Sequence, residues 1–368
     1  MICIRAPGRI CLFGEHQDYL NYNCIAMAIS KYIFLKAEMI PQRKFSINLP
    51  DLDKSLEIPL NNKELNYQSR RDYLKSGYNQ FVRKGITFKE GYNIEITGNI
   101  PINAGAASSS ALVIAWLYFL KKMSGETIHK KELANLGYYT EVNEFGEAGG
   151  KMDFFTSSFG NIILIRPRNL TNPIQQFPIK LNGFVLGDSC EKKDTVRDLI
   201  RVKSLSMKAF EELKNLNPKF NQYSSPLEDI KSYLPILKQE HQSKIIGNIL
   251  NRDITNKAHK LISQYIDKLK INSLNSKIID HFYKELGNLL NEHQNQLKIH
   301  IGCSTQKIDN MISKALDAGA LGAKINGSGF GGTMFALAPG NQENVKKAIE
   351  DAGGKAYIIT TSDGVSEY

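Results

Sequence analysis

The sequence predicts an α+β protein whose two lobes share a cleft. Its 368 residues exceed one ordinary small domain and suit two. Strand and helix patterns mix in the first half, a helical block follows, and strand patterns return near the C-terminus, an order typical of α+β architecture. We place the boundary within residues 185–195, which gives an N-terminal domain at 1–190 and a C-terminal domain at 191–368.

Three segments of the first half are expected to be strands. They are Tyr92–Thr97, in which polar and apolar residues alternate, and the short segments Asn161–Ile165 and Phe184–Leu186. The small residues of Pro101–Ser110 predict a loop, and Ala111–Met123 predicts a buried helix because its apolar residues recur at helical spacing. We expect the polar stretch Pro41–Asn62 to be irregular.

The second half has mainly helical patterns from about residue 196 to about residue 297. Leucines recur at helical spacing near the end of this block, at Leu286, Leu289, Leu290 and Leu297. Two later segments, Thr333–Leu337 and Ala356–Thr360, have strand patterns and return the chain to a sheet.

Cysteine usage and the N-terminus indicate the compartment. The five cysteines are odd in number and form no C-x-x-C pair, so free thiols in a reducing compartment are the simplest interpretation. The N-terminus lacks a signal-peptide pattern, and no apolar run reaches the roughly 18–20 residues that span a bilayer. We therefore expect a cytoplasmic protein without a membrane partner.

The net charge of +10 raises the question of an anionic partner. Lysines and arginines are spread along the chain, without an arginine-rich tail or zinc-finger spacing, so we expect no nucleic-acid partner. A basic surface would equally collect an anionic nucleotide. The oligomeric state is unknown, because no pattern in the sequence indicates it.

The first motif, Ala6–Tyr19, reads APGRICLFGEHQDY. Four polar or charged residues bracket a short apolar strand: Arg9, Glu15, His16 and Asp18. Carboxylates and an imidazole can hydrogen-bond several hydroxyls of a polyol, and glycines let backbone approach a ligand closely. Taken alone, the pattern is compatible both with a substrate pocket and with a solvated turn.

The second motif, Pro101–Ala111, reads PINAGAASSSA and leads directly into the predicted helix. Free N–H groups and the dipole at a helix start attract phosphate, and small side chains let phosphate come close. Ser108, Ser109 or Ser110 could ligand Mg²⁺ or donate to phosphate oxygens. No G-x-x-x-x-G-K-[ST] Walker loop occurs, and a simple serine cap on a core helix is the alternative.

The third motif, Asn326–Thr333, contains G-x-G-x-x-G at Gly327, Gly329 and Gly332. A dinucleotide-binding loop would open a helix, whereas this segment runs into the strand-like TMFALAP. A glycine-rich hairpin that lines a cleft fits this context better, and a plain tight turn is the alternative.

Between the second and third motifs, Glu141–Phe159 supplies carboxylates and a lysine. Phosphoryl transfer needs a carboxylate near the accepting hydroxyl, a cation for the developing charge and oxygen ligands for Mg²⁺. Glu141, Lys151 and Asp153, together with Arg9 of the first motif, supply all of these. By itself, the segment would be interpreted as an exposed acidic helix end.

The order of these motifs resembles the GHMP kinases, a superfamily that includes galactokinase, homoserine kinase, mevalonate kinase and phosphomevalonate kinase. The resemblance rests on APGRICLFGEH near residue 10, PINAGAASSSA near 105, GGKMD near 150 and KINGSGFGG near 328. It implies an ATP-dependent kinase with a ribosomal-S5-like N-terminal domain, an α/β C-terminal domain and the active site in the cleft between them. Within the superfamily, GRICLFGEHQDY looks most like the galactokinase signature.

The resemblance also implies roles on the acceptor side. Asp153 matches the aspartate that acts as catalytic base or orients the acceptor hydroxyl. Arg9 matches the arginine that stabilises charge on the transferred phosphoryl group. Four further positions match residues around the sugar: Glu15, His16, Asp18 and Gly150.

On the nucleotide side, the resemblance implies ATP and Mg²⁺ as cofactors. Ser109 and Glu141 match the metal ligands, with Glu144 as the alternative to Glu141. The loop that would wrap the triphosphate comprises Gly105, Ala106, Ala107, Ser108, Ser109 and Ser110. Gly327 and Gly329, within the motif that ends at Gly332, would close the far side of the nucleotide cleft.

Two departures from the family pattern bear on the site. Ala107 stands where the family usually has glycine, and Lys151 stands where galactokinases usually carry an apolar residue. We expect phosphorylation of the anomeric hydroxyl of galactose or a related sugar. The alternative acceptors are a uronic acid, a pentose, an amino sugar or mevalonate, and a non-catalytic sugar sensor is the alternative outside the kinases.

Overall fold

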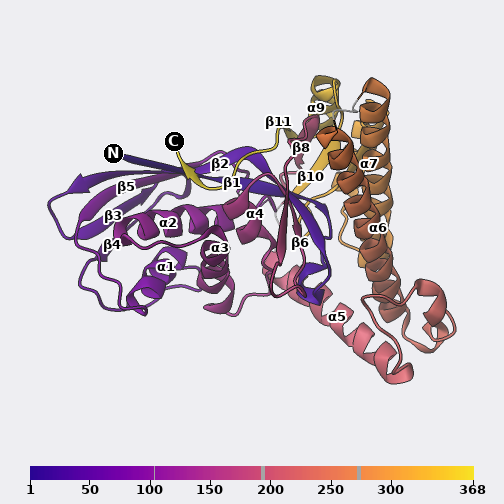
Figure 1. Cartoon of the computed structure of the whole chain (residues 1–368), viewed down its shortest axis with the longest axis horizontal. Coiled ribbons are helices and arrows are strands. Elements are labelled where there is room, and N and C mark those ends of the chain that lie inside the picture. Colours follow the sequence, from indigo (N-terminus) through magenta and orange to yellow (C-terminus); the bar gives the residue numbers. More distant parts are fainter. Residues whose placement is uncertain (103, 192–194, 272–274) are drawn as a thin grey trace.

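Two sheets organise the chain into two lobes that lie side by side (Figure 1). This computed structural model describes residues 1–102, 104–191, 195–271 and 275–368. The larger sheet has eight strands in the order β12-β1-β2-β5-β3-β4, with β6 paired to β2 and β7 paired to β6. The smaller sheet has four strands in the order β11-β8-β10-β9.

The larger sheet is antiparallel except where β3 pairs with β5. Its strands are β1 (Ile2–Phe13), β2 (Cys24–Ile40), β3 (Lys44–Leu49), β4 (Lys54–Pro59), β5 (Gly91–Gly98), β6 (Ile162–Ile165), β7 (Ile174–Phe177) and β12 (Ser366–Glu367). The helices of this lobe are α1 (Tyr73–Val82), α2 (Ser108–Ser124), α3 (Lys130–Tyr138) and α4 (Met152–Phe159), which gather on one face of the sheet (Figure 1).

Helix α2 forms the centre of the first lobe's core. Trp116 and Phe119 are fully buried, and both rings contact Phe45 of β3, at centroid distances of 5.7 and 5.6 Å. The helix begins at Ser108, three residues before the expected start at Ala111. Serine is tolerated in a first turn because the N–H groups there need no intrahelical partner.

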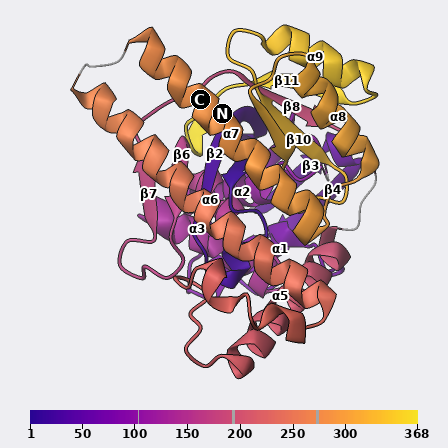
Figure 2. The ribbon, with the colours of Figure 1, turned by 90° about the vertical axis from the view of Figure 1, so that its right-hand side faces the viewer.

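The smaller sheet is antiparallel throughout. Its strands are β8 (Phe184–Asp188), β9 (Gly322–Ile325), β10 (Thr333–Leu337) and β11 (Lys355–Ile359). The helices of the second lobe are α5 (Thr195–Leu216), α6 (Gln239–Lys270), α7 (Ser276–Gln296), α8 (Gln306–Asp317) and α9 (Gln342–Asp351). Figure 2 shows the long helices α6 and α7 packed along each other across this lobe.

Most expected strands are confirmed. The segment Thr333–Leu337 is β10 residue for residue, and Tyr92–Thr97 and Phe184–Leu186 lie within β5 and β8. The remaining two, β6 and β11, agree with expectation to within one residue at each end.

The expectation that Pro41–Asn62 is irregular is wrong, whereas the mainly helical block is confirmed by α5, α6 and α7. Pro41–Asn62 contains the hairpin of β3 and β4, because Phe45, Ile47 and Leu49 alternate with polar residues and are buried. Within the helical block, residues 217–238 form loops with two short 3₁₀ turns, at Leu227–Ile230 and Leu234–Ile236. Three prolines in this stretch, at positions 218, 226 and 235, oppose a continuous α-helix.

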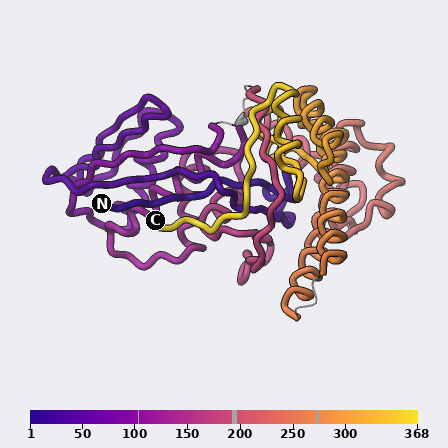
Figure 3. Tube along the Cα trace, turned by 90° about the horizontal axis from the view of Figure 1, so that it is seen from above, coloured from indigo at the N-terminus to yellow at the C-terminus, as the bar shows by residue number. Residues whose placement is uncertain are grey.

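Strands cross the expected domain boundary in both directions. Strand β8 precedes residue 190 yet pairs with β10 and β11 of the second lobe. Strand β12, at the other end of the chain, returns to pair with β1. Figure 3 shows the C-terminal segment running back to the N-terminus. A division at residues 190 and 191 therefore remains a proposal that separates the two sheets only in part.

The five cysteines are free thiols and form no disulfide. Among the residues that the structure describes, no helix combines the length and apolar character needed to cross a membrane.

Candidate active site

The three motifs and the segment Glu141–Phe159 converge on one cavity between the lobes, with a volume of about 210 Å³. Its lining includes these expected residues: Arg9, Glu15, His16, Asp18, Gly105, Ala107, Ser108, Ser109, Ser110, Glu141, Gly150, Asp153 and Gly327. Two expected residues are absent from the lining within the described part of the chain. Ala106 is buried behind the loop, and Gly329 lies against Cys303.

Arg9 of β1 and Asp153 of α4 form a bidentate ion pair in this cavity. Arg9 Nε and Nη2 donate to the two Asp153 carboxylate oxygens at 2.7 and 2.9 Å, and Nη1 donates to the Gly105 carbonyl at 2.5 Å. Burial disfavours the guanidinium charge, but the Asp153 carboxylate outweighs it and raises the pKa of Arg9. Bidentate pairing fixes the orientation of both groups, so the cavity presents a carboxylate and a cation in one defined arrangement.

The loop before α2 is anchored through its carbonyl groups. Three successive carbonyls accept hydrogen bonds: Ala104 from Thr333, Gly105 from the side chains of Arg9 and Asn326, and Ala106 from the backbone of Arg9. Asn326 also accepts from the Cys11 N–H at 2.9 Å, so one amide ties the third motif to β1 and to the loop. The first N–H groups of α2 have no intrahelical partner and are suited to bind phosphate.

Small residues allow this loop its path. A Cβ at Gly8 would lie 2.8 Å from the Ala106 carbonyl oxygen, so a side chain there would displace the loop. Ala107 adopts the left-handed conformation, with φ of 64°. That conformation favours glycine, which explains in physical terms why the residue expected at this position from the resemblance is glycine.

Glu141 lies in a π-helical turn (Tyr139–Asn143) that continues α3, and it faces the start of α2. Its two oxygens accept from the Ser109 and Ser110 hydroxyls at 2.8 and 3.1 Å. Burial raises the pKa of Glu141 to about 7, opposed by the Ser109 hydrogen bond and assisted by the charge of Asp153. Within the described residues, the Glu141 carboxylate is thus held by hydroxyls and has no ion-pair partner.

Glu144 points away from this cavity. Its carboxylate is bound by Arg83, at 2.8 Å from both Nη atoms, and by the Tyr67 hydroxyl at 2.6 Å. The hydrogen bonds from Arg83 lower the pKa of Glu144. Of the two glutamates considered from the sequence, the structure therefore places Glu141 beside the serines and Glu144 in a separate ion pair.

Asp18 and Gly150 form one wall of the cavity. A Cβ at position 150 would lie 1.5 Å from an Asp18 carboxylate oxygen, so any side chain here would force the Asp18 carboxylate to shift. Burial, and then the charge of Asp153, raise the pKa of Asp18 to about 6. His16 lies beside this wall, with its ring nitrogens 3.0 Å from the Tyr19 hydroxyl and 3.0 Å from the Ser328 carbonyl.

Glu15 lines the cavity but also has a partner that the sequence did not indicate. Its carboxylate is paired with Lys324 of β9, whose ammonium also donates to the carbonyls of Cys11 and Ile325. His293 of α7 lies 3.6 Å from the other Glu15 oxygen. Burial, and then the Lys324 charge, hold the pKa of His293 well below its usual range. This buried group joins the first motif to the second lobe.

Lys151 does not line this cavity. Its ammonium lies 3.4 Å from the Asn135 side-chain oxygen and 5.2 Å from the centre of the Tyr138 ring. Of the two cations expected near the transferred group, the structure therefore places only Arg9 there.

Sequence reasoning missed several lining residues. Arg71 lies two residues before α1 and Tyr73 is the first residue of α1. Glu147 accepts from the Tyr73 hydroxyl at 2.9 Å, and Leu199 reaches the cavity from α5. Glu147 falls within the acidic segment, so its charge was a usable signal. No motif marks Arg71, Tyr73 or Leu199, because their place depends on how the helices pack.

The arrangement can bring an acceptor hydroxyl against the terminal phosphate of a nucleotide. A helix start suited to phosphate lies beside Glu141, and the Arg9–Asp153 pair lies between the loop and the Asp18–Gly150 wall. That combination defines the class of small-molecule kinases.

Comparisons with known proteins specify the family. Residues 72–161 match the GHMP kinases N terminal domain, residues 274–355 match GHMP kinases C terminal, and residues 2–37 match the galactokinase galactose-binding signature. The chain belongs to the GHMP kinase superfamily and is an ATP-dependent kinase that acts on a small molecule.

Relatives with two different names cover nearly the whole chain. A mevalonate kinase of Pyrococcus furiosus is 29% identical over 97% of this chain and 95% of that protein. A galactokinase of Thermococcus kodakarensis is 26% identical over 98% of this chain and 99% of that protein. Among solved structures, Lactococcus lactis galactokinase complexed with galactose has a TM-score of 0.81 at 20% identity, covering 100% of this chain and 95% of that one. The last comparison confirms the fold.

Proposed function

We propose that the protein transfers the γ-phosphoryl group of ATP to the anomeric hydroxyl of galactose or a related sugar. The observation that carries the choice of a sugar is the match of residues 2–37 to a galactose-binding signature. The polar wall of His16, Asp18 and Gly150 beside Asp153 supports the choice of a sugar. This wall can donate hydrogen bonds to several hydroxyls and accept hydrogen bonds from them.

On the nucleotide side, the triphosphate lies against the N-terminus of α2, along Gly105 and Ala107–Ser110. Gly327 also lines the cavity, and its backbone lies close to the Gly105 carbonyl and to Arg9. Ala106 and Gly329 do not line the cavity in the part of the chain that the structure describes. They therefore contribute by setting the backbone path of the two loops and not by contacting the nucleotide.

The residues around Glu141 fit Mg²⁺. This ion prefers oxygen ligands and is usually bound by one or two carboxylates together with substrate phosphates. Glu141 and Ser109 supply a carboxylate and a hydroxyl 2.8 Å apart at the phosphate-facing helix start. Within the described ranges, no cluster of three or more His, Cys, Asp or Glu residues forms a metal site, which agrees with an ion that needs the nucleotide. When bound, Mg²⁺ would neutralise charge on the transferred phosphate.

On the acceptor side, Asp153 orients the attacking hydroxyl and accepts its proton. Its two hydrogen bonds from Arg9 fix the direction in which the carboxylate faces. Arg9 offsets negative charge that develops on the phosphoryl oxygens. Most of the rate enhancement then comes from positioning and electrostatics, as in other phosphoryl transfers.

Mevalonate is the second candidate acceptor, because a relative named mevalonate kinase is 29% identical over nearly the full chain. Measuring ADP release with galactose, other monosaccharides and mevalonate at equal concentrations separates the two. We expect turnover with a sugar and not with mevalonate. Turnover with mevalonate alone would overturn the choice of a sugar while leaving the kinase assignment intact.

A further inference from the structure

A second cavity, of about 370 Å³, adjoins the one that holds the Arg9–Asp153 pair. The two cavities share five lining residues: Asp18, Tyr19, Gly149, Gly150 and Met152. The far side of the second cavity is formed by α3, by the turn between β6 and β7, and by Lys203 of α5. A ligand that contacts the Asp18–Gly150 wall in the first cavity therefore lies directly beside the second.

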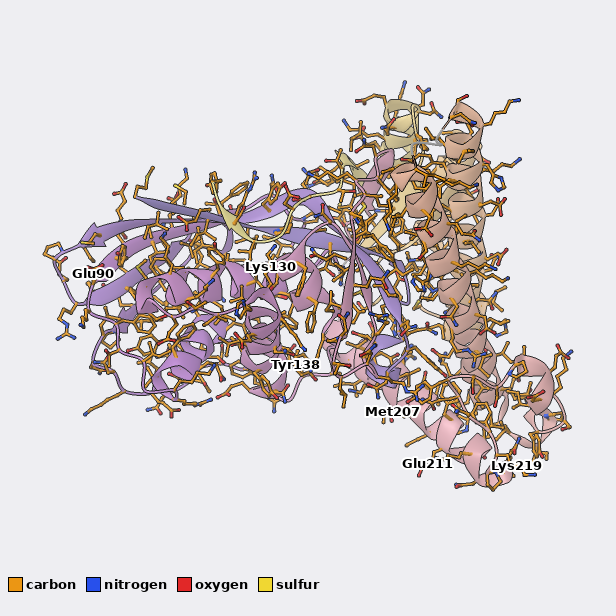
Figure 4. The ribbon with its side chains drawn as sticks, viewed as in Figure 1. Glu90, Lys130, Tyr138, Met207, Glu211 and Lys219 are labelled. Atoms are coloured by element: carbon orange, nitrogen blue, oxygen red, sulfur yellow. The ribbon has the colours of Figure 1, made fainter. Side chains whose placement is uncertain are left out.

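Three lysines from three separate elements line the second cavity. Lys131 lies on α3, Lys151 immediately precedes α4, and Lys203 lies on α5. In Figure 4, Tyr138 of α3 lies on the side of the first lobe that faces α5, the helix that carries Met207. The lysines thus converge from both lobes.

None of these three ammonium groups has an acidic partner within 4.0 Å in the part of the chain that the structure describes. The Lys151 ammonium lies 3.4 Å from the Asn135 amide oxygen and over the Tyr138 ring, and Lys203 lies 5.8 Å from the centre of the Tyr19 ring. Asp18 is the one carboxylate among the described lining residues. The cavity therefore has an excess of positive charge, which attracts anions into a concave site.

The nucleotide does not account for these lysines. Its binding loop, the α2 start and Glu141 all line the first cavity, whereas Lys131, Lys151 and Lys203 line only the second. The three lysines are instead suited to an anionic group on the acceptor, which would extend from the first cavity past Asp18 into the second.

We propose that the acceptor is a sugar that carries an anionic substituent, a carboxylate or a phosphate, and that Lys131, Lys151 and Lys203 bind this substituent in the second cavity. The proposal rests on the proposed sugar kinase activity and specifies its substrate class. The sugar ring contacts the Asp18–Gly150 wall with its acceptor hydroxyl at Asp153, while the anionic group contacts the lysines.

The test compares matched acceptors with the full chain, ATP and Mg²⁺. Galactose, galacturonate and galactose 6-phosphate differ in one substituent, and the last two distinguish a carboxylate from a phosphate. We expect kcat/KM for at least one anionic sugar to exceed that for galactose about tenfold or more, since charge-assisted hydrogen bonds are about twice as strong as neutral ones. Equal or better turnover of galactose than of both anionic sugars would overturn this inference and leave the sugar kinase intact. No turnover with any sugar would overturn both.

Single lysine variants test whether these lysines cause the preference for an anionic sugar. Lys151→Ala and Lys203→Ala should each lower the kcat/KM ratio of anionic to neutral sugar about tenfold, and should weaken its dependence on salt. Lys208→Ala is the matched control, because Lys208 is an exposed lysine on the same helix as Lys203 and lies outside the second cavity. An unchanged ratio in both lysine variants, or an equal change in the control, would contradict the proposal.

Discussion

Asp153 accepts two hydrogen bonds from Arg9, and the geometry of each group depends on the other. We expect Asp153→Asn to lower kcat by about a thousandfold or more, because an amide can still accept from Arg9 but cannot take the proton of the acceptor hydroxyl. Steady-state kinetics with the best acceptor measures kcat, and thermal unfolding checks that the variant is folded. Near-normal kcat in a folded variant would remove Asp153 from catalysis.

Glu141 makes stability depend on pH. Its pKa is about 7 in the fold against an ordinary 4.5, so the fold favours the neutral acid. This stabilisation is complete below pH 4.5 and is lost as the pH rises through 7. Glu141→Gln should therefore raise the free energy of unfolding above pH 7 by about 3 kcal/mol without Mg²⁺, and by much less at pH 4.5.

Glu144→Gln is the control for this experiment, because Arg83 lowers the pKa of Glu144. Its removal should destabilise the protein at neutral pH and have a smaller effect in acid, which is the opposite dependence. Thermal unfolding of the three proteins across pH 4–8 measures both. A parallel pH dependence of the two variants would contradict the assignment of Glu141 as the buried, unneutralised carboxylate.

At the scale of elements, the turn before α2 stores backbone strain at Ala107, whose φ is 64°. The left-handed conformation costs an L-residue about 1–2 kcal/mol, and the extra freedom of an unfolded glycine offsets about half of that. Ala107→Gly should therefore stabilise the protein by about 0.5–1 kcal/mol in denaturant unfolding.

Ala106→Gly serves as the comparison, because Ala106 is buried in the same loop and does not have a positive φ. It should destabilise by about 1 kcal/mol, through lost packing and greater freedom of the unfolded chain. If both variants shift the stability in the same direction, the strain at Ala107 is not the cause.

The start of α2 also shows why element boundaries are hard to derive from sequence. The serines at 108–110 lie inside the helix, although small polar residues are typical of loops. The β3–β4 hairpin was missed for the opposite reason, since its buried residues Phe45 and Ile47 lie within a polar stretch. In both cases, packing against the sheet decided what local composition left open.

At the scale of the whole molecule, the buried pair of Glu15 and Lys324 joins the two lobes. Lys324 is fully buried and Glu15 is 2% exposed. Lys324→Met should destabilise the protein by about 3–5 kcal/mol, because it leaves a buried carboxylate without its cation. Denaturant unfolding measures this, with Lys355→Met, an exposed lysine of the same sheet, as the control.

The double variant Glu15→Gln/Lys324→Met tests the reason for that loss. It should recover most of the lost stability, since no buried charge is left without a partner. A double variant as unstable as the single one would show that packing around Lys324, and not the charge of Glu15, sets the cost.

Sequence by itself determined the order of the motifs, the α+β class and many of the residues that line the cavity, from Arg9 in the first motif to Gly327 in the third. These follow from local chemistry: glycines where backbone comes close, small residues at a helix start, and carboxylates within a short segment. Tertiary structure alone decided that Glu141 and not Glu144 faces the serines, that Glu15 pairs with Lys324, and that Lys131, Lys151 and Lys203 share a second cavity. The partner of a charge depends on which elements pack together, and residues distant in the chain carry no local pattern that reveals it.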